Sequence, residues 1–331
     1  MNDTCAESLH CLTDQIALGI SYNGCNSNEL NWLFNMSSAP TLKDYLMLML
    51  LASIWGASFL FIKIAVETIP PLTITAGRIT LAAFILFTAA KMAGQTRPQG
   101  MRNWMIICGA AFFGNVLPFT LISWGEIKVD SGLAAVLMSL MPLATIILAH
   151  FFTTDEPLTK RKVIGLIVGF TGVIILIGPT ALNSLGAEMI AQIAIAFGAV
   201  SYSIASIMAK RLHNIPGRAL AAWVMIISTI MILPASLIVD QPWTLSPAPM
   251  ALAAVVMLGL FPTALAMLLL LQILRKHGAS FLSMNNYMVP VFGVMWGVIF
   301  LAEKPSPESA IALIFILSGI AITRVRITRK K

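Results

Sequence analysis

The sequence contains ten apolar stretches, each about long enough to cross a membrane as an α-helix. This feature constrains the possible fold of the chain more than any other. A hydrocarbon core about 30 Å thick is crossed by roughly 20 helical residues, because each residue adds about 1.5 Å. With 58% hydrophobic and only 11% charged residues, the chain lacks the polar surface of a soluble domain. We therefore predict an all-α integral membrane protein with ten transmembrane helices, at residues 44–66, 72–92, 103–125, 131–153, 162–179, 186–209, 218–239, 249–274, 279–301 and 308–325.

The basic residues predict the orientation of these helices. A formal charge of +7 is compatible with a nucleic-acid partner, but basic residues also gather in the cytoplasmic loops of membrane proteins. If the chain enters its first helix from the cytoplasm, most of the basic residues fall on that side, namely Lys43, Lys91, Arg97, Arg102, Lys160, Arg161, Lys162, Lys210, Arg211, Arg218, Arg275, Lys276, Arg324, Arg326, Arg329, Lys330 and Lys331. The pattern predicts cytoplasmic amino and carboxyl termini and no nucleic-acid partner.

The first 35 residues differ from the rest of the chain. They contain acidic residues but no Lys or Arg, and they lack the basic start and apolar centre of a signal peptide. Residues 1–41 therefore form either a disordered extension or, in part, a segment upstream of a true start at Met36. Cysteines in predicted cytoplasmic segments indicate no disulfide framework, and their spacing predicts neither a metal site nor a cofactor.

Two parts of the chain resemble each other, residues 42–179 and residues 184–326, and a basic tail at 327–331 follows. In the alignment, Trp55-Gly56-Ala57 matches Phe197-Gly198-Ala199, and further pairs are Pro142 with Pro290, Glu156 with Glu303 and Gly172 with Gly319. Each part holds five predicted helices. Because five is odd, the second copy would cross the membrane in the opposite direction, which predicts two inverted five-helix repeats.

The sequence resembles the EamA-type transporters of the drug/metabolite transporter superfamily. The resemblance covers about residues 42–326 and rests on WGASFLFIKIA at 55–65, Arg78 followed by TLAAFIL, SGLAAVLMSLMP, and the pattern from Glu156 to Gly172. It implies a multi-pass carrier of the bacterial inner membrane, often an exporter of amino acids or related metabolites, with a central cavity between the halves. Residues 1–35 and the polar stretch 285–287 depart from the family pattern.

Two cations fall inside predicted helices, where a charge costs at least about 2.5 kcal/mol near the membrane centre. Lys63 lies within a turn of its helix end and either reaches the interface or contacts substrate. Arg78 lies deeper, where it either attracts a carboxylate or phosphate or bonds neighbouring helices. Glu126, Glu156 and Glu303 fall at helix ends, so the sequence does not indicate proton coupling.

Several uncharged polar or aromatic residues are further candidates for lining the substrate cavity. The most polar point in any predicted helix is formed by Asn285, Asn286 and Tyr287. Such side chains need hydrogen-bond partners in neighbouring helices or a water-filled cavity. Weaker candidates, for which bonding or packing between helices is the alternative, are Asn115, Tyr202, Ser203 and Trp55.

Proline and glycine positions predict hinges and close helix contacts. Pro142 and Pro290 occupy equivalent places in the two parts, so they act either as paired hinges or as simple kinks. Gly165 and Gly169 have the small-xxx-small spacing, which serves either packing within the monomer or a homodimer contact.

The predicted function is secondary transport of a small solute. The sequence contains no nucleotide-binding loop and no pattern of acids, histidines or nucleophiles that predicts an enzyme. The alternative is a membrane scaffold or receptor subunit that transports nothing, which an inverted repeat disfavours.

Overall fold

The computed structural model describes residues 40–95, 97–153, 158–183 and 186–324, and the regular structure within these ranges is helical. The first half contains α3 (Leu42–Ala65), α4 (Pro71–Met92), α5 (Met101–Ala111), η1 (Phe112–Val116), α6 (Leu117–Gly125), α7 (Ser131–Met138), α8 (Leu140–Phe152) and α9 (Lys160–Asn183). The second contains α10 (Ala187–Lys210), α11 (Gly217–Ala235), η2 (Ser236–Asp240), η3 (Pro242–Thr244), α12 (Pro249–Leu258), η4 (Gly259–Leu265), α13 (Ala266–Leu282), α14 (Asn285–Leu301) and α15 (Pro307–Arg324). Predictions about residues 1–35, Glu156 and the tail 327–331 lie outside the described residues.

Within the described residues, seven helical stretches are long and apolar enough to cross a membrane. Two shorter apolar helices, Asn285–Leu301 and Pro307–Thr323, follow them. Large apolar side chains such as Phe84, Phe197 and Ile238 are exposed on these helices. Lipid is the solvent in which such a surface is stable, so the predicted class of all-α membrane protein is confirmed.

Prolines coincide with three widened, π-helical turns. Pro118 follows η1, Pro234 precedes η2 and Pro262 lies inside η4. Proline lacks an N–H and crowds the carbonyl four residues earlier, so a wider turn accommodates both effects at η1 and η4. This reason does not apply to η2, which begins after Pro234. Continuous helical segments therefore run through 101–125, 217–240 and 249–277, although they are not regular α-helices throughout.

The predicted gap between the eighth and ninth helices, residues 275–278, contains the observed break at Gly278, but the ninth helix begins later than predicted. Residues 279–282 belong to the end of α13, and α14 begins only at Asn285. The chain breaks its helical path at Gly278, where φ is 75° and ψ is −179°, a conformation that glycine adopts without a Cβ clash.

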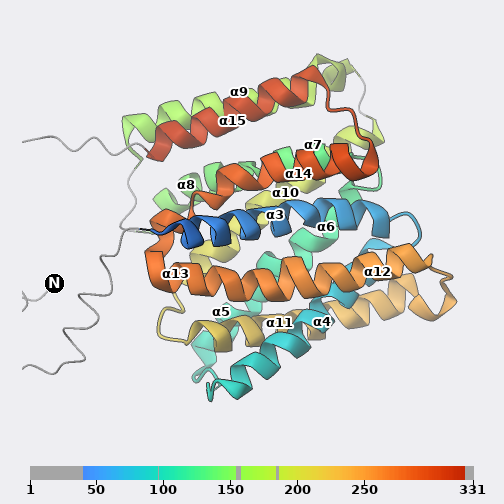
Figure 1. The fold of residues 1–331 in the computed structure, drawn as a ribbon, viewed down its shortest axis with the longest axis vertical. Helices are drawn as coiled ribbons and strands as arrows, with labels where there is room; N and C mark the ends of the chain where they lie inside the picture. The colour runs from blue at the N-terminus through green and yellow to red at the C-terminus, as the bar shows by residue number, and fades with distance from the viewer. Residues whose placement is uncertain (1–39, 96, 154–157, 184–185, 325–331) are drawn as a thin grey trace, which may run out of the picture. The chain divides into compact units, whose positions relative to one another are not determined.

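Helices from the two halves lie side by side (Figure 1). In that view α15 runs along α9 and α14 along α3, and α14 also packs on α7. In the same way α11 packs on α4, while α10 packs on α6 and α8. A Cβ on Gly165 would lie 2.5 Å from the Gly319 carbonyl oxygen, and one on Gly169 would meet Leu143. Both glycines thus serve packing within the chain, and a homodimer stays a prediction.

Candidate functional site

Arg78 is the most buried Lys or Arg side chain among the described residues. Arg78 is on α4, and only 2% of its surface is exposed. Its Cζ lies 3.8 Å from the centre of the Phe119 ring of α6, a cation–π arrangement. Its Nε and Nη2 donate to the Thr263 hydroxyl at 3.3 and 3.1 Å, and Nη2 also reaches Ser58 Oγ at 3.4 Å. The charge is therefore held by residues from both halves.

One donor of this guanidinium is left over. Arg78 Nη1 is buried and has no hydrogen-bond partner among the described residues. A buried donor without a partner costs about 1–3 kcal/mol, and more when it is charged. The arrangement therefore presents a fixed cation with the unused NH2 group of Nη1, which a carboxylate or phosphate oxygen would satisfy.

The π-helical turn η4 positions the acceptor for Arg78. Thr263 Oγ1 donates to the Leu258 carbonyl at 2.8 Å, and its lone pairs then face the guanidinium. The neighbouring Pro262 carbonyl accepts the Trp55 indole N–H at 3.1 Å. Trp55 was a predicted cavity residue, and the structure ties it to this turn. Thr263 was not predicted, although a hydroxyl beside a proline in an apolar stretch is the signal that indicates it.

Tyr202 packs against the aromatic ring that supports Arg78. The Tyr202 and Phe119 ring centroids are 6.1 Å apart, in an edge-on arrangement. Tyr202 is on α10 and is partly buried, so it brings a third long helix to this position. The structure thus brings the predicted residues Trp55, Arg78 and Tyr202 into one neighbourhood, linked through Thr263, Pro262 and Phe119.

Two other predicted residues bond neighbouring helices. Asn115, in η1, donates from Nδ2 to Ser228 Oγ at 3.2 Å. Ser203 Oγ donates to the Met141 carbonyl at 2.8 Å, and the Ala199 carbonyl of its own helix lies 3.1 Å away. These bonds agree with the alternative of interhelical bonding, and substrate contact by either residue stays a prediction.

The three polar residues at the start of α14, Asn285, Asn286 and Tyr287, differ in burial. Asn285 is 1% exposed, and neither of its amide atoms has a partner among the described residues. Asn286 is partly buried, and Tyr287 packs against the largest apolar cluster. The hydrogen bonds of Arg78 go to Thr263 and Ser58 and not to this triplet, which therefore forms a second polar group apart from the arginine site.

Lys63 stabilises a loop at one end of the helices. Its Nζ donates to the backbone carbonyls of Glu126 and Val129, at 2.9 and 2.8 Å. These two residues flank the turn between α6 and α7, so the ammonium joins α3 to that turn. The geometry favours the structural role of Lys63 over substrate contact.

At the same end, Glu303 joins the two halves. Its carboxylate follows α14 and accepts the backbone N–H groups of Ser131 and Gly132 at 2.7 and 2.9 Å. These are the first N–H groups of α7, which lack partners within their own helix. A carboxylate there also interacts favourably with the positive end of the helix dipole.

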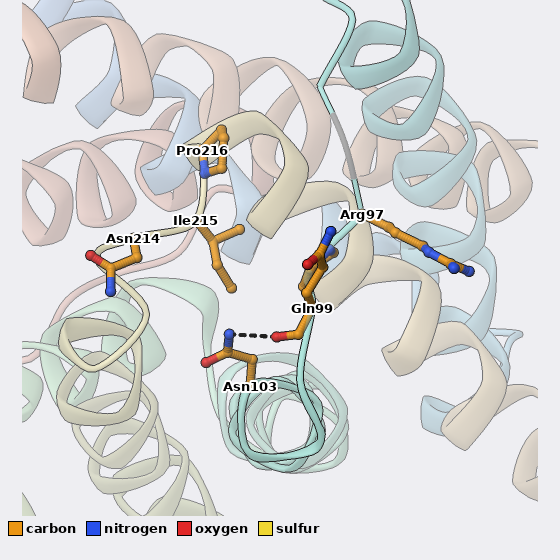
Figure 2. Close-up of a pocket in the computed structure, with 7 residues that line it drawn as sticks. Arg97, Gln99, Asn103, Asn214, Ile215 and Pro216 are labelled. Carbon is orange, nitrogen blue, oxygen red and sulfur yellow. Dashed lines mark hydrogen bonds between the residues drawn. The ribbon is translucent and has the colours of Figure 1, made fainter.

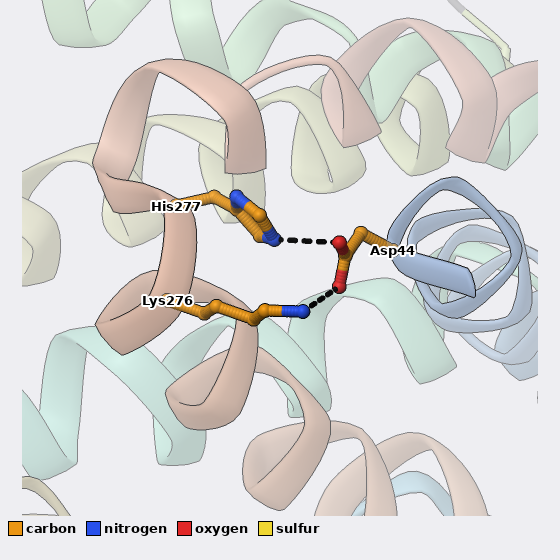
Figure 3. A network of polar contacts seen from close by, with 3 residues as sticks. All are labelled: Asp44, Lys276 and His277. Carbon is orange, nitrogen blue, oxygen red and sulfur yellow. Dashed lines mark hydrogen bonds and ion pairs between the residues drawn. The ribbon is translucent and has the colours of Figure 1, made fainter. Parts of the chain in front are cut away.

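At the opposite end of α3, an ion pair again joins the halves (Figure 3). The Lys276 ammonium lies 2.7 Å from one carboxylate oxygen of Asp44, and His277 Nε2 lies 3.1 Å from the other. Asp44 is in the first turn of α3, and both basic residues directly precede the break at Gly278 in α13. Contacts between the halves thus close both ends of this region.

A shallow pocket lies elsewhere, between two loops (Figure 2). It is lined by Arg97, Pro98, Gln99, Asn103, Asn214, Ile215 and Pro216. Asn103 Nδ2 donates to the Gln99 carbonyl at 2.7 Å, so this polar group is already engaged. The pocket contains none of the predicted site residues, and we assign it no part in the site.

The predicted hinge prolines are both buried, in α8 and α14. Pro142 comes three residues after Ser139, where a turn separates α7 from α8, whereas Pro290 lies inside α14. Movement at either proline stays a prediction. In the described part of the chain, no group of three His, Cys, Asp or Glu side chains is placed to hold a metal ion.

Comparison with known proteins agrees with this architecture. The uncharacterized transporter YoaV of Bacillus subtilis (strain 168) is 23% identical over 285 residues, covering 84% of this chain and 95% of that protein. The uncharacterized inner membrane transporter YedA of Escherichia coli (strain K12) is 25% identical over 273 residues, covering 81% and 86%. A probable terminal-alkyne amino-acid exporter of Streptantibioticus cattleyicolor is 24% identical over 275 residues, covering 82% and 90%.

A solved crystal structure has a similar fold, with a TM-score of 0.61 and 21% sequence identity, and it covers 85% of this chain and 96% of that one. The EamA-like transporter family matches the chain twice, over residues 42–178 and again over residues 189–325. These two ranges together include most of the sequence. The chain therefore belongs to the EamA-like transporter family of the drug/metabolite transporter superfamily.

Proposed function

We propose that this protein is a secondary transporter that exports an amino acid or a related carboxylate-bearing metabolite across a bacterial inner membrane. The observation that carries the proposal is Arg78, a buried guanidinium bonded across the two halves with Nη1 unused. A carboxylate is a solute group that such a donor binds strongly, through a charge-assisted hydrogen bond. One relative is a probable terminal-alkyne amino-acid exporter, which agrees with this class of solute and this direction.

We further propose ten membrane-spanning helices in two inverted repeats. The double family match supports two copies. The packing supports their inverted relation, because α3 lies against α14 and α12 while α10, its counterpart, lies against α8 and α6. Under inversion these pairs exchange with each other, and α9 with α15 and α4 with α11 map onto themselves.

In our proposal the Asp44 end of the helices faces the cytoplasm. The loops at that end carry Arg97, Arg102 and Arg218, and basic loops face the cytoplasm in membrane proteins. Both termini would then be cytoplasmic, and the Glu126 end would face outward.

Alternating access follows from how Arg78 is enclosed. The side chain is nearly inaccessible in this conformation, so a solute reaches it only after helices of the two halves separate. The contacts of Glu303 with α7 and of Asp44 with α13 are the bonds that must break in turn on the two sides. A scaffold or receptor subunit remains the alternative function, and no observed contact favours it.

The test is flux through vesicles that contain the purified full chain. We would measure efflux and counterflow of labelled amino acids, nucleosides and organic anions in proteoliposomes. Arg78→Gln removes the charge, and Arg102→Gln removes a charge from an exposed position on α5. We expect saturable flux of a carboxylate-bearing solute, at least about tenfold lower in Arg78→Gln, since a charged hydrogen bond contributes about 1.5–3 kcal/mol.

Two results would contradict the proposal in different ways. Flux that Arg78→Gln leaves unchanged would remove the arginine from the solute site but keep the carrier. A complete lack of protein-dependent flux in vesicles shown to hold folded protein would favour the scaffold. Arg102→Gln controls for a general effect of removing one basic residue.

A further inference from the structure

Glu126 is a fully buried carboxyl group that the site described above does not use. It directly follows α6, and none of its surface is exposed. Neither carboxylate oxygen has a hydrogen-bond partner among the described residues. Buried carboxylates are ordinarily paired or multiply hydrogen-bonded, so this one requires an explanation.

The charged groups that face Glu126 are already bonded to other partners. Lys63 of α3 donates to the Glu126 and Val129 backbone carbonyls, not to the carboxylate. Glu303, after α14, uses its two oxygens on the start of α7. Arg78 of α4 directs Nε and Nη2 to Thr263. In the turn itself, Lys128 and Asp130 are exposed.

A carboxyl group in these surroundings favours its neutral form. Burial raises the pKa of Glu126 well above its usual range; Lys63 opposes this, Glu303 adds to it, and Arg78 opposes it again. The physical reason is that an ionised carboxylate loses its hydration on burial, whereas a protonated one loses much less.

Other polar groups near the turn also have unused bonding capacity. Ser123, one helical turn before Glu126, and Ser131, at the start of α7, each have a buried hydroxyl without a partner among the described residues. Gln192 of α10 has a buried amide oxygen that also lacks a hydrogen-bond partner among the described residues. It follows Ala191, whose carbonyl would lie 2.9 Å from a Cβ on Gly125. Buried polar groups without partners therefore lie on the helices that adjoin the turn containing Glu126.

We propose that Glu126 is a proton-binding site that couples solute movement to a transmembrane pH gradient. The coupling rests on the proposed transport function. Water on one side supplies a proton, an O–H bond forms on the carboxylate, and that bond breaks when the proton is released to water on the other side. No other reactant is needed.

Burial explains why this proton would move with the conformational change. The enclosed conformation suits the neutral acid, and the ionised form gains free energy only where the helices open and water reaches it. Proton loss therefore favours an open conformation, and proton binding favours the enclosed one. Arg78, the proposed solute site, lies in the same enclosed region. Solute binding and proton binding therefore both shift the equilibrium between the open and enclosed conformations.

The first test needs no solute. Infrared spectra of the full chain in lipid would follow the C=O band of protonated carboxyl groups between about pH 5 and pH 9, well above the ordinary Glu pKa of about 4.3. Subtracting the Glu126→Gln spectrum isolates Glu126, and Glu67→Gln, at an exposed position, is the matched control. We expect a protonated band at neutral pH that is absent from Glu126→Gln and retained in Glu67→Gln. No such band at neutral pH would overturn the proposal.

The second test uses the solute that wild-type vesicles transport. An imposed pH gradient should drive its uphill accumulation in wild type and Glu67→Gln, at least tenfold more than in Glu126→Gln. Counterflow without a gradient should persist in Glu126→Gln, which shows that the variant is folded. Equal gradient-driven accumulation in Glu126→Gln would reject the coupling. If wild type moves no solute, the transport function and the coupling fail together, and the infrared band still decides whether Glu126 binds a proton.

Discussion

The guanidinium carbon of Arg78 lies 3.8 Å from the centre of the Phe119 ring, so a buried cation rests on an aromatic face within the first half of the chain. From the second half, Thr263 binds two nitrogens of the same guanidinium. The ring and the hydroxyl together fix the plane of the charge, which leaves Nη1 in a defined direction. This relation makes the aromatic ring part of the site, although its side chain is apolar.

Replacing Phe119 by Leu should weaken solute transport without unfolding the protein. Leu keeps most of the apolar volume but has no π face, and a desolvated cation–π contact contributes about 2 kcal/mol. We expect the KM for the transported solute to rise about tenfold or more, since 1.4 kcal/mol corresponds to a factor of ten. Initial rates of counterflow over a range of solute concentrations measure this change.

The control for this prediction is Phe112→Leu, on the same continuous helical stretch. Phe112 is exposed, so its replacement should leave the KM within about twofold of wild type. A KM that Phe119→Leu leaves unaltered would mean that the ring supports only packing.

Thr263→Val should destabilise the protein, whereas Thr263→Ser should not. Val has nearly the same shape but leaves two Arg78 nitrogens without their acceptor and the Leu258 carbonyl without its donor. Each buried polar group left unpaired costs about 1–3 kcal/mol. We expect the apparent Tm in detergent to fall by at least about 2 °C. Thr80→Val, at an exposed position of α4, should have little effect.

The helices were the part of this protein that the sequence predicted best. Lipid-exposed helices need long apolar stretches, and prolines and basic loops separate these stretches, so their limits agree with the structure to within a few residues in most places. The break at Gly278 falls inside the predicted gap between the eighth and ninth helices, and the largest departure is the start of the ninth, expected at residue 279 but observed at Asn285.

The site was predicted only in part. Arg78 was found because a charge in an apolar helix is costly. Thr263 and Phe119 were not, because a hydroxyl or an aromatic residue is common in any packed helix, and only the fold brings them to Arg78. The sequence correctly predicted that Glu126 lies at a helix end. It did not predict that the folded protein buries this side chain completely.

Two aligned glycines, Gly56 and Gly198, should respond differently to alanine. A Cβ on Gly56 would lie 2.7–2.9 Å from Phe292 and the backbone of Gly293, which cannot move without shifting α14. A Cβ on Gly198 would lie no closer than 3.3 Å, from a side-chain carbon of Ile122. Overpacking costs about 1–3 kcal/mol where the neighbour cannot yield.

We therefore expect Gly56→Ala to lower the apparent Tm by several degrees and Gly198→Ala to change it by less than about 2 °C, because α-helical alanine is itself favourable by roughly 1 kcal/mol. Thermal unfolding of both variants in the same detergent measures the difference. Equal destabilisation would show that α3 and α10 pack with similar tightness, contrary to the structure.

The buried carboxyl group of Glu126 should make stability fall as pH rises. Burial raises its pKa in the folded protein, so the folded state binds more protons than the unfolded state between the ordinary Glu pKa and this raised value. Over that range the free energy of unfolding decreases with pH, by at most about 1.4 kcal/mol per pH unit for one proton. The stabilisation is fully present below the ordinary pKa and is lost as pH approaches the folded pKa.

Glu126→Gln keeps a neutral side chain of similar size, so its apparent Tm should depend less on pH, whereas Glu67→Gln should follow wild type. Parallel pH profiles for wild type and Glu126→Gln would mean that the carboxyl group ionises in the folded protein as readily as in the unfolded chain.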